Sequence, residues 1–287
     1  MQTYNIFTNK PDSLLEGKAD FLLASSVTLT QNLSSIPAII MQAVHNLDEF
    51  SSVEILDLGL IESSDCIVEG ANIDAKEVFA KGMAFGKSYE LKGNYLILGE
   101  SIPSSTTTPT ATALALGYDV PNNMQTQSIT TALTNVRKEM GSFEKLSLVS
   151  DNMLLFCAGF LLEASRRFHV VLAGGMQMAV CLLVADKLRE DVLMQLQSDN
   201  ITLATTAWIA QDENFNFKHI LEQLSYTPHA IYTSFSFENA EIPVLKKYDE
   251  EEVKEDVGVG ACLAYATVNK RENKEVLDAI ELIIYMM

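Results

Sequence analysis

The 287-residue sequence contains few basic residues compared with acidic ones. It has 20 Lys and Arg against 38 Asp and Glu, which gives a formal net charge of -18 at pH 7. Such a field repels nucleic acid and anionic membrane surfaces, so we expect neither of them as a partner. A small anionic molecule can still bind where local hydrogen-bond donors outweigh the field.

Cysteine and histidine are also scarce, with four residues of each. The cysteines have no CxxC spacing, and three of them sit in apolar runs, where a free thiol packs as a small hydrophobic side chain. The histidines are far apart in the sequence and lack metal-ligand spacing. We therefore expect reduced thiols, a cytoplasmic protein and no metal site.

Several common motifs are missing as well. GxxxxGK[ST] and GxSxG are absent, and Leu263 takes the third glycine position after Gly258 and Gly260, so the dinucleotide fingerprint fails. The most membrane-like segment, residues 170–185, is interrupted by glycines and is shorter than the about 20 residues that a spanning helix needs. The N-terminus lacks a basic region followed by an apolar core, so we expect no secretory signal.

Short apolar runs alternate with segments of helical spacing. The apolar runs are residues 20–29, 53–58, 95–98, 169–173, 201–208 and 230–235. The helical segments are residues 35–46, 74–90, 128–140, 153–165, 176–189, 238–248 and 262–268, with a shorter one near 217–224. This alternation predicts a doubly wound, mostly parallel Rossmann-like α/β sheet with helices on both faces.

The chain ends predict a smaller helical part. We expect a Rossmann-like core at residues 53–250, with residues 1–52 and 251–287 forming a subdomain packed on it. Residues 272–287 form an amphipathic helix, and its apolar side needs a partner surface. That surface is either the N-terminal segment or a second subunit.

Residues 93–119 contain the strongest polar signal. The apolar run 95–98 stops at Gly99, and Glu100 and Ser101 follow. Six hydroxyl side chains come next, before a helix rich in alanine and leucine: Ser104, Ser105, Thr106, Thr107, Thr108 and Thr110. Ligands of open α/β sheets bind at the carboxyl ends of the strands, and a hydroxyl-rich loop leading into a helix suits a phosphate there. The alternative is an ordinary N-capped helix.

Polar residues and glycines also mark the ends of the other predicted strands. They are Asp151, Gly174, Gly175, Thr205, Thr206, Ser234 and Ser236, followed later by Glu255 with its glycines. Each is weak evidence alone. A doubly wound fold brings these ends to one edge of the sheet, so together they predict a site there.

Four motifs, in matching order, resemble one known family. They are GES (99–101) with TTT (106–108), LAGGMQMA (172–179), TTAWIAQD (205–212) and KEDVGVGA (254–261). They are similar to the archaeal and cyanobacterial branch of the nicotinate-nucleotide:dimethylbenzimidazole phosphoribosyltransferases, over roughly residues 75–266. The resemblance implies a Rossmann-like sheet, a homodimer, and no metal or redox cofactor. It also implies a glycosyltransferase that moves phosphoribosyl from nicotinate mononucleotide to an aromatic base, making the lower-ligand nucleotide of cobalamin.

The resemblance also assigns roles to residues. The incoming imidazole must lose its N–H proton, and Glu255, just before the glycines, is the implied base, with burial raising its pKa toward neutrality. The alternative for Glu255 is a carboxylate in a solvated acidic run. Glu100 and the hydroxyls after it resemble the phosphate and ribose site. The complete set expected to bind substrate is Glu100, Ser101, Ser104, Ser105, Thr106, Thr107, Asp151, Gly174, Gly175, Thr205, Ser234 and Gly258.

Several departures from the family pattern bear on activity. Asp256 and Val259 interrupt the glycine run, and Ser104 and Ser105 stand where the family often has two glycines. An added carboxylate beside the base could raise its pKa or block the base pocket, so altered or impaired catalysis is one expectation. The stretch expected between residues 21–30 and 35–44, which normally supplies part of the aromatic-base pocket, is missing.

Three functions therefore remain open. The first is the phosphoribosyltransferase. The second is a non-catalytic homologue that binds a nucleotide or base and acts as a sensor or partner subunit. The third is a related transferase that acts on another nucleotide.

Overall fold

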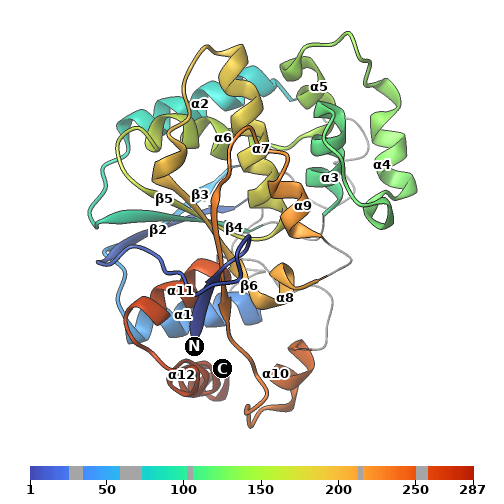
Figure 1. The fold of residues 1–287 in the computed structure, drawn as a ribbon. Coiled ribbons are helices and arrows are strands. Elements are labelled where there is room, and N and C mark those ends of the chain that lie inside the picture. The colour runs from blue at the N-terminus through green and yellow to red at the C-terminus, as the bar shows by residue number, and fades with distance from the viewer. Residues whose placement is uncertain (26–34, 59–72, 102–105, 213–215, 250–257) are drawn as a thin grey trace.

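The computed structural model describes residues 1–25, 35–58, 73–101, 106–212, 216–249 and 258–287. One seven-stranded sheet runs through the molecule in the order β1-β7-β6-β5-β4-β2-β3 (Figure 1). Its strands are β1 (Gln2–Asn5), β2 (Ala19–Ser25), β3 (Ser52–Asp57), β4 (Tyr95–Ser101), β5 (Val170–Ala173), β6 (Ile201–Thr206) and β7 (His229–Ser234). All neighbours are parallel except β1, which runs antiparallel to β7. The predicted doubly wound, mostly parallel α/β sheet is confirmed.

Helices cover both faces of the sheet. They are α1 (Ile36–Leu47), α2 (Ala75–Ser88), α3 (Thr107–Leu116), α4 (Gln127–Ala132), α5 (Ser142–Val149), α6 (Asn152–Ala164), α7 (Met176–Asp191), α8 (Ala207–Ala210), α9 (Phe217–Leu221), α10 (Pro243–Tyr248), α11 (Val259–Val268) and α12 (Asn273–Met286). In Figure 1, α2, α6 and α7 lie above the sheet, while α1, α11 and α12 lie below it.

Strand β4 separates two hydrophobic cores. Leu96 and Leu98 belong to the core with α2, α6 and α7, whereas Tyr95 and Ile97 belong to the core with α1, α11 and α12. All four side chains are buried, because successive residues of a strand point to opposite faces and both faces are covered. The continuous apolar run therefore predicts the position of this central strand correctly.

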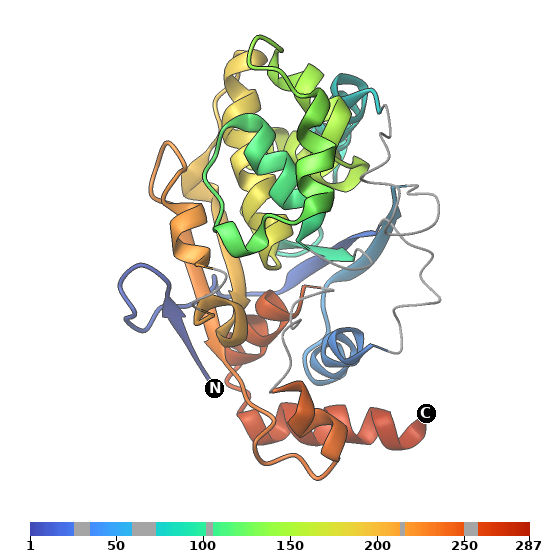
Figure 2. The same ribbon diagram turned by 90° about the vertical axis from the view of Figure 1, so that its right-hand side faces the viewer.

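Helix α12 finds its apolar partner within the chain. Its inward side chains, including Val276 and Ile280, are buried with those of α1 in the lower core, and both helices lie below the sheet in Figure 2. Arg271, just before α12, donates from Nε and one terminal nitrogen to Asp48 at 2.8 and 2.9 Å. The sequence left two partners open for the apolar side of this helix, the N-terminal segment or a second subunit, and the structure shows the N-terminal segment there.

The segment 1–52 also contributes β1 and β2 to the sheet itself. The division into a core at residues 53–250 and a subdomain from the chain ends stays a prediction.

Two predicted helices are wrong in extent. The helix at 128–140 is only α4 and a short 3-10 turn, Leu133–Asn135, after which Val136 is extended. Threonine hydroxyls there bond back to carbonyls four residues earlier, which weakens a helix. The helix at 238–248 begins only at Pro243, because proline has no amide hydrogen and holds the preceding residue extended.

Two strand predictions also need correction, and one strand was not predicted at all. Strand β4 continues through Gly99 to Ser101, and β6 ends at Thr206, where α8 begins. Strand β1 is too short and too polar to be recognised in the sequence. Residues 170–185 form β5, a turn and the first part of α7, as predicted. Within the described residues, no helix is long and apolar enough to cross a membrane.

Helices α2 and α6 approach closely at glycines. A Cβ atom added at Gly82 would lie 2.0 Å from the carbonyl oxygen of Phe156, and one at Gly159 would lie 2.1 Å from that of Phe79. These are backbone atoms, which cannot rotate away as a side chain can.

We predict that Gly82→Ala lowers the free energy of unfolding by about 1–3 kcal/mol, because the added methyl forces the two helices apart. Urea denaturation followed by circular dichroism measures this change. Lys81→Ala is the matched control on the exposed side of the same helix, where an ion pair with Glu77 is worth less than about 1 kcal/mol. Equal stabilities of the two variants would contradict the close packing.

Candidate functional site

The strand order reverses between β2 and β4. From β2 the chain moves to one side to form β3, and then to the other side to form β4, β5, β6 and β7. In doubly wound sheets a crevice opens at the carboxyl ends of the strands at such a reversal, and ligands bind there. Ser25 at the end of β2 is in register with Ser101 of β4 and Asp57 of β3, so these three strand ends lie level.

Most of the predicted site residues that the structure describes lie along this carboxyl edge. Glu100 and Ser101 end β4, Thr106 and Thr107 begin α3, Asp151 caps α6, Gly174 and Gly175 join β5 to α7, Thr205 and Ser234 lie near the ends of β6 and β7, and Gly258 caps α11. The predicted base Glu255 and the predicted binding residues Ser104 and Ser105 lie outside the described residues.

Ser234 is the least suited of these positions. Its hydroxyl donates to the carbonyl of Gln2 at 3.0 Å and accepts from the Gln2 amide at 3.2 Å, so it joins β7 to β1. Strand β7 is three positions from β4 in the sheet, which is about 14 Å. A role for Ser234 in binding stays a prediction.

Glu100 is buried and packs against a glycine. Only 1% of its surface is exposed. A Cβ atom added at Gly174 would lie 3.2 Å from both Cγ and Oε1 of Glu100 and 2.9 Å from Cγ of Met178. The glycine between β5 and α7 therefore leaves room for the Glu100 carboxyl group at the carboxyl edge.

Two further glycines bring α11 into the same edge. Gly258 has φ +71, and an added Cβ would lie 3.2 Å from Cα of Gly99 and 3.3 Å from Cβ of Ala173. A Cβ at Gly260 would lie 2.3 Å from Cα of Thr205. The first turn of α11 thus rests directly on β4, β5 and β6, and a side chain at either glycine would push it away.

Helix N-termini supply positive potential at this edge. Helices α3 and α7 directly follow β4 and β5, so they begin where these strands end. Helix α6 precedes β5 and runs antiparallel to it, so α6 also begins at the carboxyl edge. None of the predicted site residues is a lysine or arginine. An anion bound here would therefore be held by amide N–H groups, hydroxyls and helix dipoles rather than by basic side chains.

Ser25 and Asp57 also lie at this edge, and nothing in the sequence pattern singles them out. Ser25 is 1% exposed. Only the strand order shows that β2 and β3 flank the reversal, so their last residues could not be recognised as site residues from sequence.

The described part of the chain has no group of three or more His, Cys, Asp or Glu side chains arranged to hold a metal ion.

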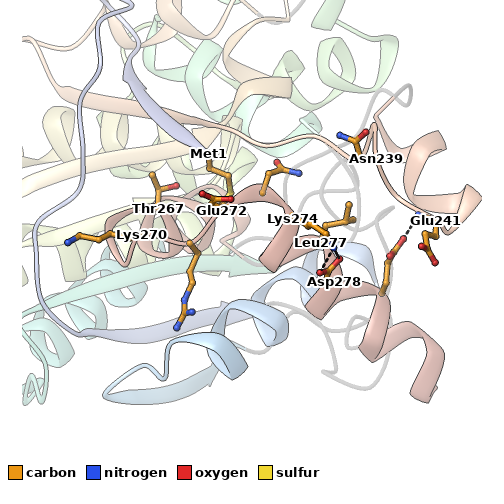
Figure 3. A pocket seen from close by; sticks show the side chains of 12 residues that line it. Met1, Asn239, Glu241, Thr267, Lys270, Glu272, Lys274, Leu277 and Asp278 are labelled. Atoms are coloured by element: carbon orange, nitrogen blue, oxygen red, sulfur yellow. Dashed lines mark hydrogen bonds and ion pairs between the residues drawn. The ribbon is translucent and has the colours of Figure 1, made fainter.

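A cavity of about 700 Å³ lies around the N-terminal half of α12 (Figure 3). It contains none of the predicted site residues. Its charged groups are partly paired, as in the 2.6 Å contact between Lys274 and Asp278.

The comparisons with known proteins fit this architecture. No protein-family model matches the sequence. A UPF0284 protein of Methanocaldococcus jannaschii is 32% identical over 222 residues, which cover 72% of this chain and 62% of that protein. UPF0284 proteins of Microcystis aeruginosa and Sulfurisphaera tokodaii are 28% and 26% identical over 87% and 96% of this chain, and over 72% and 84% of their own. The chain belongs to this archaeal and cyanobacterial family.

Two solved structures show the fold of this UPF0284 protein. A nicotinate-nucleotide-dimethylbenzimidazole phosphoribosyltransferase from Thermus thermophilus matches with a TM-score of 0.56 and 15% identity, covering 93% of this chain and 83% of that one. CobT from the same organism matches with a TM-score of 0.51 and 16% identity over 93% of this chain and 84% of that one. The expected resemblance to this phosphoribosyltransferase fold is confirmed. The match to the Methanocaldococcus protein spans less than two thirds of that protein's length.

We predict that Gly260→Ala in the UPF0284 protein lowers the free energy of unfolding by about 1–3 kcal/mol, because the methyl would overlap the backbone of β6. Thr267→Ala, near the other end of α11, is the matched control, since its hydroxyl bonds only within the helix to the carbonyl of Leu263 in the interactions described. Chemical denaturation of both variants tests this. A Gly260 variant as stable as the control would show that α11 does not rest on β6 as described.

Proposed function

We propose that this UPF0284 protein is a phosphoribosyltransferase that moves the phosphoribosyl group of nicotinate mononucleotide to an aromatic nitrogen base, dimethylbenzimidazole or a similar one. The observation that supports it most is the buried Glu100 beside Gly174 at the strand-order reversal, next to Ser101 and the start of α3. This edge combines an acceptor for ribose hydroxyls with donors for a phosphate, on the fold that phosphoribosyltransferases use.

The reaction needs little acid catalysis. The bond between ribose C1′ and the pyridinium nitrogen breaks, and its electron pair returns to the ring, which leaves as neutral-ring nicotinate. Positive charge builds on the ribose meanwhile, as in glycoside cleavage. The lone pair of the incoming base forms the new C1′–N bond, and the base then gives up its N–H proton.

The described residues suit the two polar ends of the nucleotide. Glu100 can accept hydrogen bonds from ribose hydroxyls, whereas its charge would repel the phosphate. Thr106 and Thr107, both partly exposed at the start of α3, are better placed to donate to phosphate oxygens, together with the amides of that helix turn. Gly174 leaves room for the Glu100 carboxyl group beside the end of β5.

Glu255 is the proposed acceptor of the base proton. It precedes Gly258 by three residues in the sequence, and Gly258 lies against Gly99 of β4. A carboxylate within hydrogen-bond reach of the azole N–H is the group that this proton transfer requires. The neighbouring Asp256 is a reason to keep the non-catalytic binding protein as the second candidate.

The assembly also stays a prediction. A homodimer is expected from the family resemblance. Leu282, Tyr285 and Met286 at the end of α12 are 60%, 68% and 78% exposed, and a second subunit is one surface that could cover them.

We predict that the protein releases nicotinate from nicotinate mononucleotide when a benzimidazole is present, and that Glu255→Gln slows this transfer by about 10²–10⁴-fold because the proton acceptor is lost. Chromatography of the products over a panel of benzimidazoles and purines measures the reaction and identifies the base. Glu90→Gln, an exposed acid between α2 and the start of β4 at the opposite edge of the sheet, is the control and keeps full activity.

Full transfer by the Glu255 variant would remove this residue as the base. Binding of nicotinate mononucleotide by the wild-type protein without any nicotinate release would favour the non-catalytic homologue instead. A product from another nucleotide would identify the related transferase.

A further inference from the structure

Asp151 is a buried carboxyl group that the described part of the chain satisfies at only one of its two oxygens. Oδ1 accepts a hydrogen bond from the Leu154 amide at 2.8 Å and so caps α6. Oδ2 is also buried, and it has no hydrogen-bond partner among the described residues. The side chain is 2% exposed. A cap needs only one oxygen, so the burial of the other is left unexplained by the fold.

The position of Asp151 is at the carboxyl edge of the sheet. Helix α6 leads into β5 and runs back along the sheet, so its N-terminus lies where the strands end. Asn152, the next residue, donates from Nδ2 to the carbonyl of Leu58, which directly follows β3, at 3.1 Å. Asp151 is therefore close to the strand-order reversal between β2 and β4.

Asp151 and Glu100 both act electrostatically on the thiol of Cys157. Both carboxyl groups raise the pKa of the Cys157 thiol, in addition to burial, and Asp151 also raises that of Cys181. The thiols on which Asp151 acts are Cys157 of its own helix and Cys181 of α7, and Glu100 of β4 acts on the first of them. Neither thiol supplies a positive charge, so no described basic group neutralises Asp151. Burial raises the pKa of Asp151 to about 6, although the amides of Leu154 and Met153 lower it.

On the basis of the proposed function, we propose that Asp151, in its ionised form, is a second buried carboxylate at the carboxyl edge, besides Glu100, and that it stabilises the positive charge developing on ribose C1′ as nicotinate leaves. Asp151 acts through its charge and needs no contact with the sugar, because a charge shielded from water acts over longer distances than one in solvent. It takes up no proton and forms no bond during transfer.

This role fits the charge of the substrate as well. The nicotinate ring carries a positive pyridinium nitrogen before the bond breaks, and that charge moves toward C1′ in the transition state. A buried carboxylate near both positions favours the ground state somewhat and the transition state more, since only the latter places the charge on the ribose. The unfavourable burial of Asp151 is then the kind of local instability that functional sites retain.

The test is Asp151→Asn, compared with the wild type in stability and in transfer. Asparagine caps helices as well as aspartate does, and it stays neutral. The pKa of Asp151 is higher in the folded than in the unfolded state, so protonation of this group stabilises the fold. This contribution to stability is complete below the unfolded pKa of 3.8 and is lost as the pH rises through about 6. We therefore expect the Asn variant to melt about 5 °C higher than the wild type at pH 8 and at about the same temperature at pH 4.

The variant should at the same time transfer more slowly. We expect kcat to fall by about 10²-fold at pH 8, and the ratio of wild-type to variant kcat to shrink as the pH falls through about 6, since only the wild type loses a charge at this position. Protonation of the proposed base Glu255 lowers kcat in both proteins and cancels in this ratio. Asp74→Asn is the matched control: Asp74 caps α2 with a 2.9 Å bond from the Glu77 amide, but it is exposed. Its melting temperature and kcat should not change. If Asp151→Asn does not fold, Asp151→Ser keeps a cap and removes the charge in the same way.

Calorimetric binding separates this proposal from the proposed function. Asp151→Asn should bind nicotinate mononucleotide about 10-fold more weakly and ribose 5-phosphate, which has no cationic ring, with unchanged affinity. If the wild type shows no transfer, the proposed function fails, and this binding pattern then shows only that Asp151 interacts with the cationic ring of the bound nucleotide. If the wild type transfers, an Asn variant with unchanged kcat, pH profile and nucleotide affinity overturns the role of Asp151 and leaves the transferase intact.

Discussion

The site of this protein depends on close backbone approach at the carboxyl edge of the sheet. Gly258 lies against Gly99 of β4, and Gly260 lies against the backbone of Thr205 in β6. At Gly260 the contact leaves no space for a Cβ atom, and Gly258 combines a tight contact with a positive φ that side chains rarely adopt. Glycines at these positions therefore let the first turn of α11 meet three strand ends. The segment that contains Glu255 joins the described chain at this point.

Electrostatics impose the second constraint. A chain with a net charge of -18 that binds a nucleotide phosphate must provide local donors. The predicted site residues include no basic side chain, and helices α3, α6 and α7 begin at the edge instead. Buried carboxyl groups at Glu100 and Asp151 add negative charge nearby, which would be unfavourable for phosphate and favourable for a sugar that becomes cationic. The edge therefore suits a ligand with a phosphate at one end and a sugar that becomes cationic at the other better than it suits a simple anion.

The comparisons and the geometry carry different parts of the conclusion. Identity of 32% to an archaeal UPF0284 protein shows the family, whereas structures matched at 15% and 16% identity show the fold alone. One fold supports many activities, so the residues at the carboxyl edge, rather than the fold, indicate the function. The cavity around α12, although about 700 Å³ in volume, contributes nothing to that argument, because its lining holds none of these residues.

The sequence by itself determined the α/β class and the central position of residues 95–98, because alternation of apolar runs and burial on both faces are local properties. It also placed Glu100, Asp151 and Gly174 at strand and helix ends. Only the tertiary structure decided that β2 lies between β3 and β4, which makes Ser25 and Asp57 neighbours of Ser101. Strand order depends on contacts between distant residues, and the same is true of the burial that leaves one oxygen of Asp151 without a partner among the described residues.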